Sequence, residues 1–198
     1  MAGKGAATRD NIVEKSLHLF SVKGYYHTSV NDILAATGLT KGGLYGHFRG
    51  KEEIWQAAYD RAVAIWRSIV FEGVKKIDDP LVRMETALDN DLRRYLGGNV
   101  FDGGCFFLNM MVELSGQDPA MAGQVLEGIM GFSRLLAQWL AEAEEKEVLS
   151  PGLDHEEMAR FIVTTINGCA ALYAATKDET TWQTTLSQIH LYLNSART

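Results

Sequence analysis

The segment LTKGGLYGHF, residues 39–48, gathers hydrogen-bond donors and glycines in a short stretch. N–H and O–H donors bind phosphate oxygens. In this segment they are the side chains of Thr40, Lys41, Tyr45 and His47. Gly42 and Gly43 lie among them, although each glycine costs a helix roughly 0.5–1 kcal/mol relative to alanine. A helix with glycines in its first turn can bring its N-terminus close to an anion, so the segment predicts contact with phosphates.

The preceding residues predict a second helix that meets this segment at a tight turn. Ser29 and Asp32 form a variant of the capping box, which predicts a helix start at Ser29. Gly38 stands where a left-handed C-cap is expected. Thr40 then caps a helix that we expect over residues 41–48. Two helices joined by the glycine turn GLT are typical of a helix-turn-helix, whose second helix enters the major groove of DNA.

Two longer helices are expected on either side of this motif. Thr8 can cap a first helix that ends at Gly24. Its apolar face would consist of Val13, Leu17 and Phe20. Residues 51–76 predict a long fourth helix that is apolar on more than one side. Such a helix packs on two sides, so we expect it to bridge a small N-terminal unit and a larger body.

Proline, aspartate and glycine signals divide the rest of the chain into further helices. Asp79 and Asp118 each precede a proline, which predicts an N-cap followed by the first helical residue. Residues 97–104, 149–157 and 177–182 are the expected breaks. No strand-like alternation persists anywhere, so the sequence predicts an all-α fold of about nine helices.

Composition limits the class of protein. The chain has 198 residues, 46% of them hydrophobic, and a net charge of −6. Residues 1–51 carry seven basic and three acidic side chains, so the N-terminal end is positive and the remainder strongly negative. This asymmetry favours nucleic-acid binding by the N-terminal end, although chance clustering on solvated faces explains the charge alone equally well. With two separated cysteines, no exported leader and no long apolar run, we expect a cytoplasmic protein with no membrane partner.

From Arg9 to Trp55 the chain resembles the TetR family of transcriptional repressors. The matching pattern is KGYYHTSVNDILAATGLTKGGLYGHFRGKEEIW, and the remainder matches in helical layout. The resemblance implies a DNA-binding domain over residues 1–51 and a ligand-binding and dimerisation domain over 52–198. Gly43 and Gly46 stand where the family often has larger side chains. They remove potential DNA contacts, which favours recognition through backbone contacts and DNA shape.

The resemblance also implies which residues meet DNA. Thr28 would bond phosphate, Ser29 would cap the second helix, and Lys51 would reach phosphate from the fourth helix. Tyr25 and Leu39 are assigned to the small core. The complete predicted DNA-binding set is Thr28, Ser29, Thr40, Lys41, Gly42, Gly43, Tyr45, His47 and Lys51.

In the body, apolar and small residues predict an interface and a pocket, with an ordinary internal core as the alternative for each. Small residues permit close helix approach between two subunits. The predicted dimer residues are Ile162, Ile166, Gly168, Ala171, Leu172, Ala175, Leu186, Ile189 and Leu193. A sensor pocket should be apolar with a few polar groups. The predicted pocket residues are Trp66, Cys105, Phe107, Asn109, Met110, Met111, Glu113, Met130, Leu136, Trp139 and Asn167.

Cys105 follows two glycines at an expected helix start, where the helix dipole favours a thiolate. The segment GGCFFLNMMVEL is similar to a subgroup of TetR-like regulators with GC before this helix. Some relatives respond to electrophiles or oxidants, which implies a possible thiol sensor. The alternative is a small buried apolar residue.

The sequence therefore predicts a ligand-responsive repressor that binds a near-palindromic operator as a homodimer and is released by a small-molecule inducer. An enzyme is not expected, because no catalytic residues assemble and no cofactor or metal is implied. The segment HEEMAR at His155 lacks a second histidine at zinc-ligand spacing. The alternative function is a helical small-molecule carrier or scaffold without specific DNA binding.

Overall fold

The computed structural model of the chain describes residues 3–198, with Lys4 described in its backbone only. Over these residues nine α-helices follow one another, interrupted by one 3₁₀ turn (η1) and one π-helical segment (η2), and the only β feature is a single bridge between Leu149 and Arg197. The elements are α1 (Lys4–Lys23), α2 (Val30–Thr37), α3 (Lys41–Tyr45), α4 (Lys51–Val70), η1 (Val74–Lys76), α5 (Pro80–Asp89), η2 (Asn90–Leu96), α6 (Phe106–Leu114), α7 (Pro119–Glu145), α8 (His155–Thr176) and α9 (Glu179–Ser195). The predicted all-α fold is confirmed.

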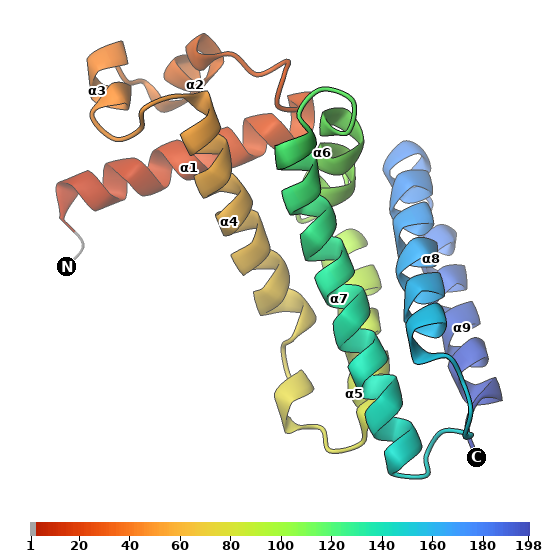
Figure 1. The fold of residues 1–198 in the computed structure, drawn as a ribbon. Helices are drawn as coiled ribbons and strands as arrows, with labels where there is room; N and C mark the ends of the chain where they lie inside the picture. The colour runs from red at the N-terminus through yellow and green to blue at the C-terminus, as the bar shows by residue number, and fades with distance from the viewer. Residues whose placement is uncertain (1–2) are drawn as a thin grey trace.

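Helices α1, α2 and α3 form one end of the molecule, and α4 runs from that end along the body (Figure 1). Helix α6 lies beside the first turns of α7, and α8 and α9 run side by side at the far side from α1–α3 (Figure 1). The predicted bridging role of α4 is confirmed, since α4 packs against α1 at one end and against η2 in the body.

The caps around the helix-turn-helix form as the sequence predicts. Ser29 and Asp32 make a reciprocal capping box at the start of α2. Gly38 ends α2 in the left-handed region at φ 70°. The Thr40 hydroxyl accepts a hydrogen bond from the Gly43 backbone N–H at 3.2 Å. Local capping chemistry therefore sets the angle at which α3 leaves α2.

Three helix ends differ from the prediction. α1 begins at Lys4, ahead of Thr8, and its N-cap Gly3 makes no side-chain hydrogen bond. α3 ends at Tyr45 and the chain turns at Gly46. α4 ends at Val70, because Gly73 adopts φ 77° and turns the chain before η1.

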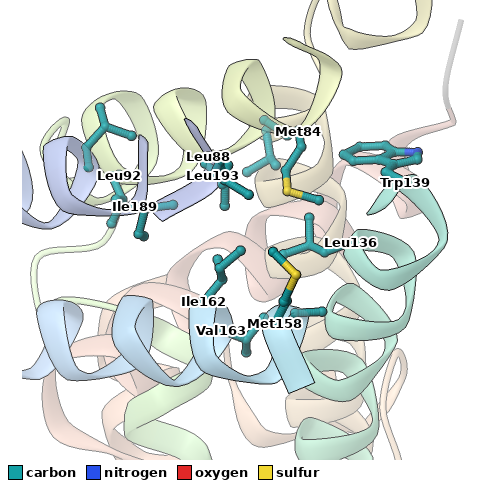
Figure 2. Packing of buried hydrophobic residues seen from close by; sticks show 14 of the residues in the cluster. Met84, Leu88, Leu92, Leu136, Trp139, Met158, Ile162, Val163, Ile189 and Leu193 are labelled. Atoms are coloured by element: carbon teal, nitrogen blue, oxygen red, sulfur yellow. The ribbon is translucent and has the colours of Figure 1, made fainter. Parts of the chain in front are cut away.

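The hydrophobic core consists of two clusters. The N-terminal cluster joins α1–α4 to α6 and the start of α7, through Phe20, Leu44, Phe48, Trp55, Phe106, Met110, Leu114 and Val125. The C-terminal cluster joins α5, η2, α7, α8 and α9. Figure 2 shows its side chains meeting between these helices, among them Met84, Leu136, Ile162, Ile189 and Leu193. Because the N-terminal cluster includes α6, the end formed by α1–α3 shares its core with the body.

Four of the predicted dimer residues are buried in the core of the single chain. Ile162, Leu186, Ile189 and Leu193 are at most 5% exposed. They belong to the C-terminal cluster, and Figure 2 shows three of them, Ile162, Ile189 and Leu193, facing its interior. Their apolar character serves packing within one subunit, which leaves their side chains unavailable to a second copy.

Helix α5 passes directly into the π-helical turn η2. Asn90 at the junction has helical dihedral angles, and its side chain donates hydrogen bonds to the backbone carbonyls of Val70 and Glu72. These bonds hold the end of α4 against η2. Single π-helical turns are often found at functional sites, and this one carries Asp91 and Tyr95 into the space between the clusters.

Candidate DNA-binding surface and ligand cavity

Helix α3 turns its apolar side inward and leaves its polar side open. Leu44 is fully buried and Phe48, just beyond the helix, is 2% exposed. On the open side lie the exposed side chains of Thr40 and Lys41, with Tyr45 50% exposed. The exposed donors therefore sit on the face that a helix-turn-helix presents to DNA.

The glycines of α3 are not required by the packing of the chain itself. A Cβ placed on Gly42 would meet nothing within 4 Å. A Cβ on Gly43 would lie 3.5 Å from the Thr40 hydroxyl oxygen, an ordinary contact. Both residues also have ordinary helical geometry within α3, so no positive φ calls for glycine. The packing of the chain itself therefore does not explain why these two positions are glycine.

Thr28 and Lys51 are engaged inside the chain. Thr28 is fully buried and its hydroxyl donates a hydrogen bond to the Gly24 carbonyl at 2.7 Å. The Lys51 ammonium donates to the carbonyls of Tyr25 and Thr28 at 3.0 and 3.1 Å, and lies 4.1 Å from the centre of the Tyr25 ring. Burial lowers the pKa of Lys51. Both side chains brace the turn between α1 and α2, and the Thr28 hydroxyl is placed too deep for the expected phosphate contact.

The two remaining predicted DNA residues lie nearer the surface. Ser29 is exposed, and its hydroxyl bonds Asp32 within the capping box. His47 is half-buried and lies beside the first turn of α1, where its ring is 3.9 Å from a Cβ built on Gly5. His47 therefore sits between the start of α1 and the end of α3.

A cavity of about 540 Å³ lies between α4, η2, α6, α7 and α8. Six aromatic side chains line it, namely Tyr59, Trp66, Phe71, Tyr95, Phe107 and Phe132. The glycines of α7 at its edge, Gly128 and Gly131, leave room beside α4, and a Cβ on Gly128 would lie 2.8 Å from the Tyr59 hydroxyl. The volume and the apolar lining are those of a small-molecule site.

Four of the predicted pocket residues line this cavity: Trp66, Cys105, Phe107 and Asn167. Ile166, predicted for the dimer interface, lines it too. Sequence reasoning missed Asp91, Tyr95 and Arg67 in the lining. The local sequence Asp89–Arg94, DNDLRR, is mostly polar, which fits an exposed position and gave no signal that Asp91 would be buried.

The other predicted pocket residues lie elsewhere. Met110 and Met111 pack in or against the N-terminal cluster, where the Met110 sulfur accepts a hydrogen bond from the Trp55 indole. Leu136 and Trp139 are buried in the C-terminal cluster, and Met130 is a half-buried residue of α7 outside the lining. Asn109 donates a hydrogen bond to the Gly103 carbonyl at 2.8 Å, which ties α6 to the glycine loop before it.

Asp91 is the buried charged group of the cavity wall. It is 6% exposed, and one carboxylate oxygen accepts a hydrogen bond from the Trp66 indole N–H at 2.8 Å. No cation pairs with it within the described part of the chain. Removal from water raises the pKa of Asp91 to about 6, and the hydrogen bond from Trp66 opposes that rise only in part.

Cys105 forms the N-cap of α6 and lines the cavity. The Tyr95 hydroxyl donates a long hydrogen bond to the Cys105 sulfur, at 3.9 Å. Burial raises the pKa of the Cys105 thiol, and backbone groups at the helix start lower it by less. This direction favours the alternative of a buried neutral thiol over the expected thiolate, because desolvation outweighs the helix dipole here.

Glu113 connects α6 to the end formed by α1–α3. Its carboxylate accepts hydrogen bonds from the backbone N–H groups of Tyr25 and Tyr26 at 2.8 and 2.9 Å. Gly24 makes room for it, since a Cβ there would lie 2.6 Å from a Glu113 oxygen. Glu113 does not line the cavity, but it lies on the same helix as Phe107, which does. The start of α6, with Cys105 and Phe107, forms part of the cavity wall.

The remaining predicted dimer residues share one exposed stripe of α8. Gly168, Ala171, Leu172 and Ala175 all face outward, with Leu172 62% exposed. Phe161, 52% exposed, continues the stripe, and Leu191 of α9 is 58% exposed. α8 also satisfies the length and composition of a membrane span, with 39% of the window buried. Helices in the cores of globular proteins satisfy the same criteria, so this is weak evidence for a membrane.

Within the described residues no group of three histidine, cysteine or acidic side chains is placed to hold a metal ion. His155, whose segment resembled the start of a zinc motif, pairs with Glu144 at 2.7 Å.

Comparison with known proteins matches both parts of the chain. Residues 12–58 match the family described as bacterial regulatory proteins, tetR family, and residues 80–189 match the tetracyclin repressor-like C-terminal domain. An uncharacterised HTH-type transcriptional regulator of Lactococcus lactis is 33% identical, over 86% of this chain and 85% of its own. The HTH-type transcriptional repressor ComR of Escherichia coli is 27% identical, over 81% of this chain and 76% of its own. The crystal structure of a TetR transcriptional regulator from Chloroflexus aurantiacus, 28% identical, superposes with a TM-score of 0.91 over 98% of each chain.

Proposed function

The chain belongs to the tetR family of bacterial regulatory proteins, and from this premise we propose that it is a ligand-responsive transcriptional repressor acting as a homodimer. The family consists of DNA-binding regulators, in agreement with the expectation that the protein is not an enzyme. We propose that the protein acts in the cytoplasm, where two copies of α3 bind a near-palindromic operator.

One observation carries the DNA-binding half of the proposal. α3 exposes Lys41 and Tyr45 beside Gly42 and Gly43, where an added Cβ would meet nothing within 4 Å at Gly42 and only ordinary contacts at Gly43. A helix of this shape can lie close against a phosphate backbone, with few long side chains to read base edges. We therefore expect recognition to rely on backbone contacts and DNA shape.

The regulatory half rests on α6. This helix starts at the cavity wall and ends near Glu113, whose carboxylate holds the turn between α1 and α2. A ligand in the cavity that displaces α6 would pull on that turn and shift the position of α3. The ligand would then lower the operator-bound population. The equilibrium would shift by the difference in the free energy of ligand binding between the two states.

The homodimer rests on the exposed stripe of α8. Its small residues, Gly168, Ala171 and Ala175, would let the same stripe of a second copy approach closely around Leu172. In this arrangement residues 1–51 act as the DNA-binding domain and residues 52–198 as the ligand-binding and dimerisation domain.

The test is selection of the purified protein against random double-stranded DNA, followed by footprinting of the enriched sequences. A near-palindromic site, bound with an affinity that falls steeply with salt, supports the proposal. Enrichment of no sequence by the folded protein at low salt contradicts it and favours the carrier without specific DNA binding.

A matched pair of variants tests the dimer in the same assay. Leu172→Glu, on the α8 stripe, should yield monomers by sedimentation and lose the palindromic site. Leu126→Glu, at the similarly exposed leucine of α7, should leave both unchanged. Dimers of the Leu172→Glu protein would show that another surface joins the subunits.

A further inference from the structure

The chemical class of the inducer can be argued from the polar groups of the cavity. This argument rests on the proposed function, since it concerns the ligand of the same site. The cavity is otherwise apolar and aromatic, so each polar atom that reaches it selects strongly among ligands. Two side chains, Asp91 and Asn167, bring oxygen atoms to its wall without a full set of partners within the described chain.

Asp91 uses one of its carboxylate oxygens. The Trp66 indole donates to Oδ1, and the other oxygen has no hydrogen-bond donor in the described part of the chain. A buried carboxylate without a cation is costly to the folded protein. A bound cation would offset this cost, because it restores the attraction that the carboxylate lost on leaving water.

Asn167 adds a second free acceptor. Its amide nitrogen donates to the Val163 carbonyl one turn earlier in α8 at 2.8 Å, which leaves the amide oxygen available. Three side-chain donors of the lining are already engaged within the chain. The Trp66 indole is bound to Asp91, the Tyr59 hydroxyl points to the Gln124 carbonyl, and the Tyr95 hydroxyl points to the Cys105 sulfur.

The aromatic side chains complete the environment of a cation. Trp66 is edge-to-face with Phe71, Phe107 and Phe132, with ring centroids 5.5, 6.3 and 5.2 Å apart. Aromatic faces attract cations and also pack against apolar rings. The other charged residues of the lining, Asp60 and Arg67, are exposed, so they belong to its open side.

We infer that the inducer is a lipophilic cation, an aromatic or alicyclic amine whose ammonium group binds Asp91 and Asn167 while its apolar part fills the aromatic cavity. The ammonium supplies the N–H donors that the two free oxygens lack. An anionic ligand of the same size is excluded from this position by the Asp91 carboxylate.

The test compares two probes of nearly equal shape, 2-(naphthalen-2-yl)ethylamine and 2-(naphthalen-2-yl)ethanol, by calorimetric titration of the full-length protein at pH 7.5. The amine should bind at least about 10-fold more tightly than the alcohol. In Asp91→Asn this preference should vanish while the alcohol still binds. Asp60→Asn, which removes an exposed carboxylate from the same lining, should keep the preference.

A pH series gives a second readout. Lowering the pH from 7.5 to 5 protonates Asp91, so the affinity for the amine should fall toward that for the alcohol, whose affinity should stay constant. The other titratable side chains of the lining are Tyr59, Asp60, Arg67, Tyr95 and Cys105, and no histidine lines the cavity. Asp60→Asn should show the same pH series as the parent.

Equal affinities for amine and alcohol in the parent, an amine preference that survives in Asp91→Asn, or binding of neither probe would overturn the inference. Failure of the proposed function has a different signature. If the amine binds with the expected preference but leaves operator binding unchanged in a gel-shift assay, the ligand class stands and the coupling to DNA fails. If operator binding and dimerisation hold and the amine preference is absent, only the ligand class is wrong.

Discussion

The proposed DNA-binding end and the proposed ligand cavity differ in where their functional groups lie relative to the hydrophobic core. At the DNA-binding end the core under α3 is filled by Leu44 and Phe48, and the groups proposed to meet DNA lie outside it. In the body the core is hollow, and the groups proposed to meet a ligand, above all Asp91, lie inside it.

This difference sets the cost of function in each region. The exposed donors of α3 remain solvated when no DNA is bound, so their cost to folding is small. Asp91 is 6% exposed, and the rise of its pKa to about 6 reflects the cost of removing its charge from water. Substitutions on the exposed face of α3 should therefore change DNA binding and leave stability unchanged. Substitutions inside the cavity should change both ligand binding and stability.

The largest effect is expected at the DNA-binding end, from Gly43→Leu. A Cβ fits at Gly43, so the protein should fold, but the longer side chain would hold α3 away from DNA. We expect operator affinity to fall at least about 100-fold, roughly 2.7 kcal/mol, with the melting temperature nearly unchanged.

The matched control is Gly123→Leu on α7, where a Cβ meets nothing within 4 Å. It should bind operator like the parent. Fluorescence anisotropy with the selected operator measures both variants. If Gly43→Leu binds operator normally, close approach to DNA does not explain the glycines of α3, and the proposed role of its exposed face is wrong.

Asp91→Asn tests whether the buried charge in the cavity wall lowers the stability of the protein. Because the pKa of Asp91 is raised to about 6 from 3.8, the folded state binds its proton more tightly than the unfolded state does. The free energy of unfolding of the parent should therefore drop as pH rises from about 4 to 7. Asp91→Asn lacks this loss and should be more stable than the parent at pH 8, by up to roughly 3 kcal/mol.

Urea denaturation at pH 4 and pH 8 measures the difference between the two proteins. The gap should shrink toward zero at the lower pH. A gap of the same size at both values would mean that burial of the charge is not what costs the parent its stability. Asp60→Asn, with its exposed carboxylate, is the control in which no such gap is expected.

Glu113→Gln tests whether the two regions communicate. The substitution keeps one acceptor oxygen but removes the charge that holds two backbone N–H groups. Hydrogen bonds to charged groups contribute about 1.5–3 kcal/mol, so we expect a loss of stability on the order of 1–2 kcal/mol. Inducer-dependent release of operator should weaken as well.

The exposed Glu145, near the end of α7, provides the control, and Glu145→Gln should change stability by less than about 0.5 kcal/mol. Thermal unfolding and gel shifts with inducer cover both readouts. Full inducer response in Glu113→Gln would mean that the cavity signals through another path, such as α4.

The smallest effect concerns Cys105. With its pKa raised by burial, the thiol should react with iodoacetamide at pH 7.5 several-fold more slowly than free cysteine. Peptide mass spectrometry separates it from Cys169. A rate above that of free cysteine would restore the thiolate expected from the sequence and place a reactive group inside the cavity.

The sequence predicted the helix-turn-helix because its signals are local. A capping box needs Ser29 and Asp32, and a left-handed turn needs Gly38, all within a few residues of one another. The helix ends that were missed had weaker signals, as at Gly3, which caps α1 without a side-chain bond. Likewise the α8 stripe around Leu172 follows from helical spacing along one element.

Only the tertiary structure decided which face of each helix packs against the rest of the chain. Ile162 and Leu172 both lie on α8 and both look apolar in sequence, yet one is fully buried and the other 62% exposed. Glu113 reaches a partner at a separation of 88 residues, a contact that no local pattern encodes. Asp91 faces a cavity because α4, α6, α7 and α8 meet around η2 without filling the space. Capping depends on neighbours along the chain, whereas burial depends on neighbours in space, and those are set only when all the helices have packed.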